Sequence, residues 1–164
     1  MLVISNKAKI SKLADIEDSI RGSKIIIGDD TVIDSFVRIK PVGGIADIEI
    51  GNNVHINSGC VLFSGNGIKI GNDVLLAPGC ILVPVNHAYK ERSRTIIEQR
   101  FNVSRGGITI GNDVWIGAGS TILDGVMIPD GVVIGACSLV MWENELKPYG
   151  IYAGNPLQFI GNRE

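Results

Sequence analysis

Aliphatic residues recur every six positions along most of the chain. The longest run comprises Ile110, Ile116, Ile122, Ile128, Ile134 and Val140, and shorter runs in the same period are Ile27, Ile33 and Ile39, then Ile50, Ile56 and Leu62, then Ile70, Leu76 and Leu82. The fourth position after each of these residues is again small or β-branched, as at Val54, Cys60 and Val114. Two inward positions in six residues define a short strand and a turn, which neither a helical period nor simple alternation produces. The pattern therefore predicts an all-β fold, a parallel β-helix whose stacked coils share one aliphatic core.

The pattern is weaker at the amino end and is interrupted at three places. Ile10, Leu13, Ile16 and Ile20 fit either a first irregular coil or one short amphipathic helix, and we favour the coil. The period slips after Ile39, Leu62 and Leu82. The longest interruption, NHAYKERSRTIIEQRFNVSRGG, predicts a loop at about residues 86–107 that leaves the coil. Such long loops in compact domains are usually lids or binding elements.

The composition is that of one small domain. The chain has 164 residues and a formal net charge of −2, so we expect a single domain over residues 1–164, with residues 145–164 capping its carboxyl end. No long basic run and no long apolar run is present, so we expect neither nucleic-acid binding nor membrane insertion, and a cytoplasmic location. The loop nevertheless carries an excess of basic residues, which as a group suits a phosphate-bearing ligand: Lys90, Arg92, Arg94, Arg100 and Arg105 against Glu91 and Glu98.

The cysteines and histidines are the residues most able to carry chemistry. Cys60, Cys80 and Cys137 are odd in number and lack CxxC spacing, which argues against a disulfide framework and a zinc cluster, so we interpret all three as buried thiols. The only histidines are His55 and His87, and His87 lies where the last regular strand gives way to the loop. Imidazole ionises near neutral pH, so His87 is a candidate general base, although a purely structural role is also open.

Two segments, IKIGNDVLLAPGCIL and ITIGNDVWIGAGSTILDGVMIPDGVVIGACSLV, resemble the hexapeptide-repeat acyltransferases, and the resemblance extends over roughly residues 25–160. It implies a left-handed triangular prism and a homotrimer with its active site between subunits. The hand follows from the resemblance alone, because the general rule for parallel strands favours right-handed connections.

The segment IGNDVLLAPGCILVPVNH, which ends at His87, resembles the sugar O-acetyltransferases, including the galactoside and maltose acetyltransferases. This resemblance implies that His87 is the catalytic base and that Asn57, on the coil below, faces it across a groove. Asn57 would bind the acceptor or the developing oxyanion; its alternative role is that of a turn-forming residue. Transfer in this family is direct, without an acyl-enzyme, so the cysteines need not act as nucleophiles.

The resemblance also implies contacts with acetyl-CoA as co-substrate, with no metal required. Trp115 matches a Trp near the thiol end of CoA, and the backbone at Ala118 and Ala136 matches positions along the pantetheine arm. The chain departs from the family at Met141 and Trp142, where Thr-Lys is common, and at Gln158, where Arg is frequent. Met141, Trp142 and Arg163 are therefore the candidate contacts of the adenosine end, Trp142 by stacking on adenine and Arg163 by meeting a phosphate.

The loop sequence NHAYKERSRTIIEQ and the closing GNP most resemble the O-acetyltransferases of capsule and lipopolysaccharide biosynthesis. The first expectation is thus acetylation of a hydroxyl on a sugar-like acceptor. N-acetylation of a nucleotide-linked amino sugar and a catalytically inactive β-helix scaffold remain alternatives. A γ-type carbonic anhydrase is excluded, because it needs three zinc-binding histidines and the chain has two.

Overall fold

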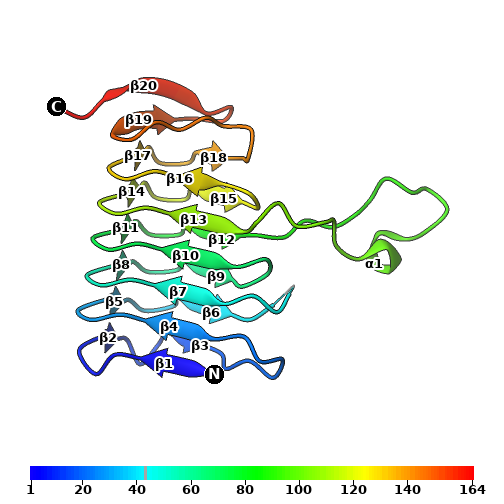
Figure 1. The fold of residues 1–164 in the computed structure, drawn as a ribbon, viewed down its shortest axis with the longest axis horizontal. Coiled ribbons are helices and arrows are strands. Elements are labelled where there is room, and N and C mark those ends of the chain that lie inside the picture. The colour runs from blue at the N-terminus through cyan, green and yellow to red at the C-terminus, as the bar shows by residue number, and fades with distance from the viewer. Residues whose placement is uncertain (43) are drawn as a thin grey trace.

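The structure is a computed structural model that describes residues 1–42 and 44–164. Its short strands stack into three sheets around one axis (Figure 1). Sheet A contains β1 (Leu2–Ile4), β4 (Ile25–Ile27), β7 (Ile48–Ile50), β10 (Ile68–Ile70), β13 (Ile108–Ile110) and β16 (Met127–Ile128). Sheet B contains β2 (Lys9–Ile10), β5 (Val32–Ile33), β8 (His55–Ile56), β11 (Leu75–Leu76), β14 (Trp115–Ile116), β17 (Val133–Ile134), β19 (Gly150–Ala153) and β20 (Gln158–Asn162). Sheet C contains β3 (Asp15–Ile16), β6 (Arg38–Lys40), β9 (Val61–Phe63), β12 (Ile81–Val83), β15 (Thr121–Leu123) and β18 (Leu139–Val140).

Each coil visits sheets A, B and C in turn, and equivalent strands pair in parallel. In Figure 1 the strands of sheet A lie in front and run leftward as the chain climbs, so the coil is left-handed, as the resemblance implied. Strands β1, β2 and β3 form a first coil, which confirms the coil rather than the helix for the amino end.

The core is a set of aliphatic columns. Strand pairing places Ile56, Leu76, Ile116 and Ile134 directly above one another, and all four are buried. The second inward position of the repeat is buried too, for example at Val54 and Val114. Because each coil buries its aliphatic residues only against its neighbours, stability comes from the stack.

The expectation that all three cysteines are buried is wrong for one of them. Cys60 and Cys80 are buried, whereas Cys137 is exposed. The inward position of that turn is taken by Ser138, and Cys137 precedes it with φ of 55°. Equivalent turns carry glycines with positive φ at this place, Gly59, Gly79 and Gly119, so Cys137 lies at the outer point of the turn.

The turns between sheets A and B are joined by a ladder of side-chain oxygens. The backbone N–H of Asp29 donates to Asn52 Oδ1, that of Asn52 to Asn72 Oδ1, that of Asn72 to Asn112 Oδ1 and that of Asn112 to Asp130 Oδ1. The distances are 2.6–2.9 Å. Each rung satisfies a backbone donor that the strands leave free at the corner.

The carboxyl end of the coil is covered by β19 and the antiparallel β20, and the Tyr152 side chain of β19 is buried. The only helix among the described residues is α1 (Ile96–Gln99). In the part of the chain that the structure describes, no helix is both long enough and apolar enough to span a bilayer.

Candidate functional site

The turns that lead from sheet C to sheet A form one edge of the prism, here called the C–A corner. The loop between β12 and β13 leaves the prism at this corner (Figure 1). His87 lies at the base of the loop and pairs with Phe101 on the returning arm. The N–H of Ala88 donates to the carbonyl of Arg100 at 2.9 Å, and the N–H of Asn102 donates to that of Asn86 at 2.8 Å. The outgoing and returning arms of the loop are therefore hydrogen-bonded to each other at His87.

The side chain of His87 is oriented by a backbone carbonyl. Its Nδ1 lies 3.1 Å from the carbonyl oxygen of Arg100. Because a carbonyl oxygen only accepts hydrogen bonds, the proton of the neutral ring resides on Nδ1, and the lone pair of Nε2 is free. The ring also packs on Phe101, with centroids 4.7 Å apart. This is the protonation state that a general base acting through Nε2 needs.

The orienting carbonyl belongs to a residue with unusual backbone geometry. Arg100 follows α1 as its C-cap and has φ of 59°, in the left-handed region that favours glycine. Its carbonyl accepts hydrogen bonds from both the His87 side chain and the Ala88 N–H. Sequence reasoning did not single out the backbone of Arg100, because no Gly or Asn marks the turn.

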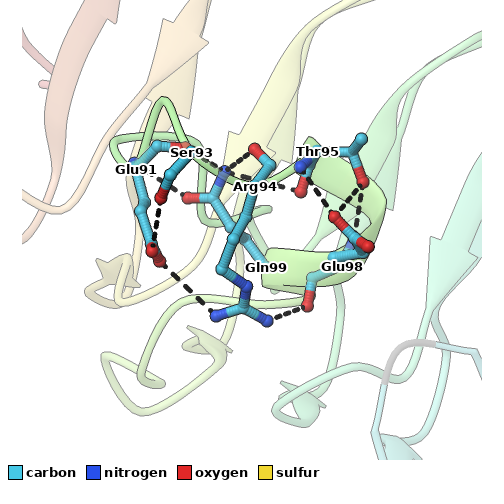
Figure 2. Close-up of polar contacts among 6 residues, drawn as sticks. All are labelled: Glu91, Ser93, Arg94, Thr95, Glu98 and Gln99. Carbon is cyan, nitrogen blue, oxygen red and sulfur yellow. Dashed lines mark hydrogen bonds and ion pairs between the residues drawn. The ribbon is translucent and has the colours of Figure 1, made fainter.

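The loop is organised by polar contacts within itself (Figure 2). Thr95 and Glu98 form a reciprocal capping box at the start of α1, and its hydrogen bonds lower the pKa of Glu98 below its usual value. The Gln99 side chain donates to the carbonyl of Glu91 at 2.9 Å, and Arg94 donates to the carbonyl of Glu98 at 2.7 Å. No residue of α1 is buried, so these contacts rather than packing shape the helix.

Two hollows meet at His87. The Phe101 hollow, of about 660 Å³, is lined by His87, Arg94, Ile97, Glu98, Arg100 and Phe101. The Arg105 hollow, of about 450 Å³, is lined by Asn86, His87, Tyr89, Ile96, Asn102 and Arg105. Phe101 also borders a smaller hollow formed with Ile20 and Val42 near the amino end. His87 thus lies at a junction where two bound groups can meet.

The returning arm of the loop is tied down by a buried carboxylate. Asp124 is 3 % exposed and accepts hydrogen bonds from the N–H of Arg105 at 2.8 Å, the N–H of Gly107 at 2.9 Å and the Asn66 amide at 3.1 Å. The guanidinium carbon of Arg105 lies 5.1 Å from the centre of the Trp142 ring. Sequence analysis did not single out Asp124, because no motif marks it as a partner of the loop.

The other predicted site residues lie at a different edge of the prism. Asn57 follows β8, and Ala118 and Ala136 follow β14 and β17, all at the corner between sheets B and C. Sheet C separates this B–C corner from the C–A corner, where His87 lies. Among the hollows described for residues 1–42 and 44–164, none is lined by both Asn57 and His87. That Asn57 and His87 face each other across a groove therefore stays a prediction. It requires the two side chains to come from different chains of an oligomer.

The remaining candidates are spread over the prism. Trp115 projects from the outer face of β14, 49 % exposed, between Leu75 and Val133 of the neighbouring strands. Met141 and Trp142 follow β18 at the C–A corner. Arg163 binds the Asp113 carboxylate at 2.8 Å and the carbonyl of Gly131 at 3.0 Å, so its guanidinium already has acceptors within the chain.

The two core cysteines are not suited to nucleophilic chemistry. A hydrogen bond with Cys60 and burial raise the pKa of the Cys80 thiol. Cys60 Sγ in turn lies 3.1 Å from the carbonyl oxygen of Ala77. Burial keeps both thiols away from reactants, so neither is suited to act as a nucleophile.

Comparisons with known proteins agree with this architecture. The family model described as bacterial transferase hexapeptide (six repeats) matches residues 107–141. A probable macrolide acetyltransferase of Lysinibacillus sphaericus is 51 % identical over 59 residues, which are 36 % of this chain and 32 % of that protein. A putative acetyltransferase of Staphylococcus aureus is 37 % identical over 114 residues, 70 % of this chain and 54 % of that protein. The chain thus spans about a third to a half of the length of these relatives.

Two solved structures extend the comparison to nearly the whole chain. AntD, an N-acyltransferase from Bacillus cereus in complex with dTDP and 3-hydroxybutyryl-CoA, has a TM-score of 0.80 and 27 % identity, and the match covers 99 % of this chain and 83 % of AntD. A maltose O-acetyltransferase from Clostridium difficile has a TM-score of 0.62 and 23 % identity, covering 97 % of this chain and 68 % of that one, and shows the shared fold alone. These matches confirm the resemblance that the sequence motifs indicated: the chain has the repeat and the left-handed β-helix of the hexapeptide-repeat acyltransferases.

Proposed function

We propose that this protein transfers an acetyl group from acetyl-CoA directly to a sugar, with His87 as general base. The observation that carries the proposal is the orientation of His87, whose Nδ1–H donates to Arg100 and leaves Nε2 free beside two hollows. Nε2 removes the proton from the acceptor as its oxygen or nitrogen attacks the thioester carbonyl. The carbon–sulfur bond then breaks, and the departing thiolate of CoA takes up a proton.

We assign the contacts of CoA as the resemblance implies. Trp115 and the backbone at Ala118 and Ala136 would hold the pantetheine arm, and Met141, Trp142 and Arg163 are candidates for the adenosine end. In support, relatives of this fold have been solved with CoA or acyl-CoA bound. Since Asn57, Ala118 and Ala136 lie at the B–C corner and His87 at the C–A corner, the complete site in this proposal is shared between subunits of a homotrimer.

The acceptor group is proposed to be a sugar hydroxyl of capsule or lipopolysaccharide biosynthesis. A second candidate is the amine of a nucleotide-linked sugar, and one observation favours it. AntD, the N-acyltransferase that matches 99 % of this chain, was solved with dTDP-4-amino-4,6-dideoxyglucose bound. Both acceptors use the same base and the same thioester, so they differ only in the attacking atom.

The test is a screen of sugar acceptors with acetyl-CoA, in which release of free CoA thiol is measured. Each hydroxyl compound is paired with the compound that carries an amine at the same carbon. Faster turnover of the hydroxyl compound supports O-acetylation, and a preference for the amine of more than about tenfold, roughly 1.4 kcal/mol, supports the second candidate. A wild-type protein that neither binds acetyl-CoA saturably nor releases thiol with any acceptor is a scaffold, and the proposal then fails.

A further inference from the structure

Arg105 is a charged side chain without a partner carboxylate. Among the described residues, no Asp or Glu lies within salt-bridge distance of its guanidinium, and Asp124 binds only its backbone N–H. The neighbouring Arg94, by contrast, is bound to Glu91 and to the carbonyl of Glu98. Three arginines line a hollow together with His87: Arg94 is paired, whereas Arg100 and Arg105 have no carboxylate within salt-bridge distance among the described residues.

This charge is held in a defined place. The guanidinium stacks over Trp142 at 5.1 Å, and the backbone of Arg105 is tied to the buried Asp124. Gly125 makes room for the pair, because a Cβ there would lie 2.6 Å from Arg105 Cβ and 3.1 Å from Trp142 Cβ. A cation that is fixed by an aromatic ring and a backbone anchor loses little side-chain entropy when it binds an anion.

The surroundings of Arg105 also suit an anion. Besides Arg105, the Arg105 hollow is lined by the polar residues Asn86, His87, Tyr89 and Asn102 and by Ile96, with no carboxylate among its lining residues. The Phe101 hollow on the other side of His87 includes Glu98. Each hollow thus contains an arginine without a carboxylate partner, but of the two only the one with Arg105 has no carboxylate in its lining.

We propose that Arg105 binds a phosphate carried by the acceptor sugar, so that the acceptor is a sugar phosphate such as a nucleotide-linked sugar. The proposal rests on His87 being the base. A sugar ring places a phosphate on its anomeric carbon within one ring width of the attacking group, which fits His87 and Arg105 lining one hollow. In acetyl-CoA the whole pantetheine arm separates the thioester from the nearest phosphate, but Trp142, over which Arg105 lies, is itself a candidate contact of the adenosine end. The experiment therefore includes a CoA arm that distinguishes a phosphate of the donor from one of the acceptor.

The experiment measures the binding of UDP, dTDP and GDP, each against its nucleoside, by calorimetry. Wild-type protein should bind at least one diphosphate more tightly than the nucleoside, and Arg105→Gln should raise the Kd of that diphosphate by about tenfold or more. Arg105→Lys should recover part of the loss, since the charge remains without the planar fork. Arg92→Gln is the matched control: it removes the same charge from the loop at a residue that lines no described hollow, and should change the Kd by less than about twofold.

CoA and pantetheine provide the second arm, which separates the two sources of phosphate. Arg105→Gln should leave both Kd values within about twofold of wild type. The proposal is overturned if no diphosphate binds better than its nucleoside, if Arg105→Gln leaves diphosphate binding unchanged, or if the loss falls on CoA instead. Transfer of acetyl to a sugar by a wild type that binds no diphosphate overturns this inference but not the proposed function; failure to bind acetyl-CoA contradicts the proposed function.

Discussion

The chemistry proposed for the loop base depends on a few single residues, and foremost on the hydrogen bond between His87 and Arg100. The carbonyl of Arg100 selects the ring nitrogen that carries the proton, and the positive φ of Arg100 aims that carbonyl at the ring. A residue held in this strained region is often found at a functional site. His55, on the outer face of β8, provides a natural comparison within the same chain.

Replacement of His87 tests its role as base. We expect His87→Ala to lower kcat by about two to four orders of magnitude, because a general base acts in the transition state, while the Kd of CoA changes little. His55→Ala is the control and should keep near wild-type kcat. Steady-state kinetics and CoA titration measure both effects, and retention of more than about a tenth of wild-type kcat in His87→Ala would show that His87 is not the base.

The pH dependence of kcat/KM distinguishes the two acceptor groups. The base must be unprotonated to accept a proton, so the rate should fall at acid pH. With a hydroxyl acceptor the profile should rise once and then stay flat, because the hydroxyl remains neutral. An amine acceptor must itself lose a proton before it attacks, which adds a second rise at higher pH. A hydroxyl acceptor that showed two rises would point to a second ionising group.

Thiol reactivity should follow the turn geometry of Cys137. In the native protein one thiol per chain, Cys137, should react rapidly with a disulfide reagent, because Cys60 and Cys80 are buried and become accessible only after denaturation. We also expect Cys137→Ser to keep kcat within about twofold of wild type, since the proposed transfer is direct. Loss of activity in this variant, or a burst of acyl-enzyme that it abolishes, would instead indicate a covalent route through Cys137.

Among the elements, α1 and the strands of the prism are stabilised in different ways. The strands bury a continuous aliphatic core, whereas α1 buries nothing and is shaped by its capping box and by Gln99. The position of the Arg100 carbonyl is therefore sensitive to the capping box, while the melting of the prism is not.

Thr95→Ala should remove the capping oxygen and cost the helix about 1 kcal/mol. We expect lower kcat with an almost unchanged Tm. Since the pKa of Glu98 is lowered in the folded loop, the stability that its carboxylate contributes is present above the ordinary pKa of the group and is lost as pH falls through the lowered value. Wild type should therefore lose loop order at acid pH, and Thr95→Ala should lose less over the same range. Thermal melts and hydrogen exchange of residues 95–100 measure the two effects.

Loss of one rung from the ladder between sheets A and B should lower the stability of the protein and leave its activity unchanged. The side-chain oxygen of Asn72 accepts a hydrogen bond from the backbone N–H of Asn52, and the backbone N–H of Asn72 donates to the side-chain oxygen of Asn112. Asn72→Ala should leave the Asn52 donor without this partner and cost about 1 kcal/mol of the free energy of unfolding. Activity per folded molecule should stay unchanged, because the A–B corner is remote from the loop. Chemical denaturation provides the measurement, and an unchanged free energy would show that water replaces the rung at no cost.

For the whole molecule, the separation of Asn57 from His87 within one chain predicts a shared site. We expect three chains by light scattering. The sharper test co-expresses His87→Ala with Asn57→Ala: mixed trimers contain sites in which His87 and Asn57 are both wild type, supplied by different chains. Recovery of activity well above either parent supports the shared site. No recovery, or an active monomer, would place both side chains in one chain.

The period of six was enough to predict the coil, its core and the exit of the loop, because strand, turn and burial repeat together in the sequence. The prediction that Cys137 is buried was wrong. Cys137 lies one residue before the inward-facing Ser138, and its own side chain is exposed. Arg105 and Trp142 meet through the stacking of coils, and no local motif links them. The strained turn at Arg100 and the anchor at Asp124 depend on the loop's path, which has no period.

The register of the prism is unaffected by the loop. Leu82, before the loop, pairs with Ile122, and Ile108, after it, pairs with Ile68, as though a short turn joined them. One coil further on, Asp124 and Gly125 make that short turn between the same two sheets. The C–A corner should therefore tolerate exchange of the whole loop, His87 included, for a loop of another length while the stack of coils is left intact.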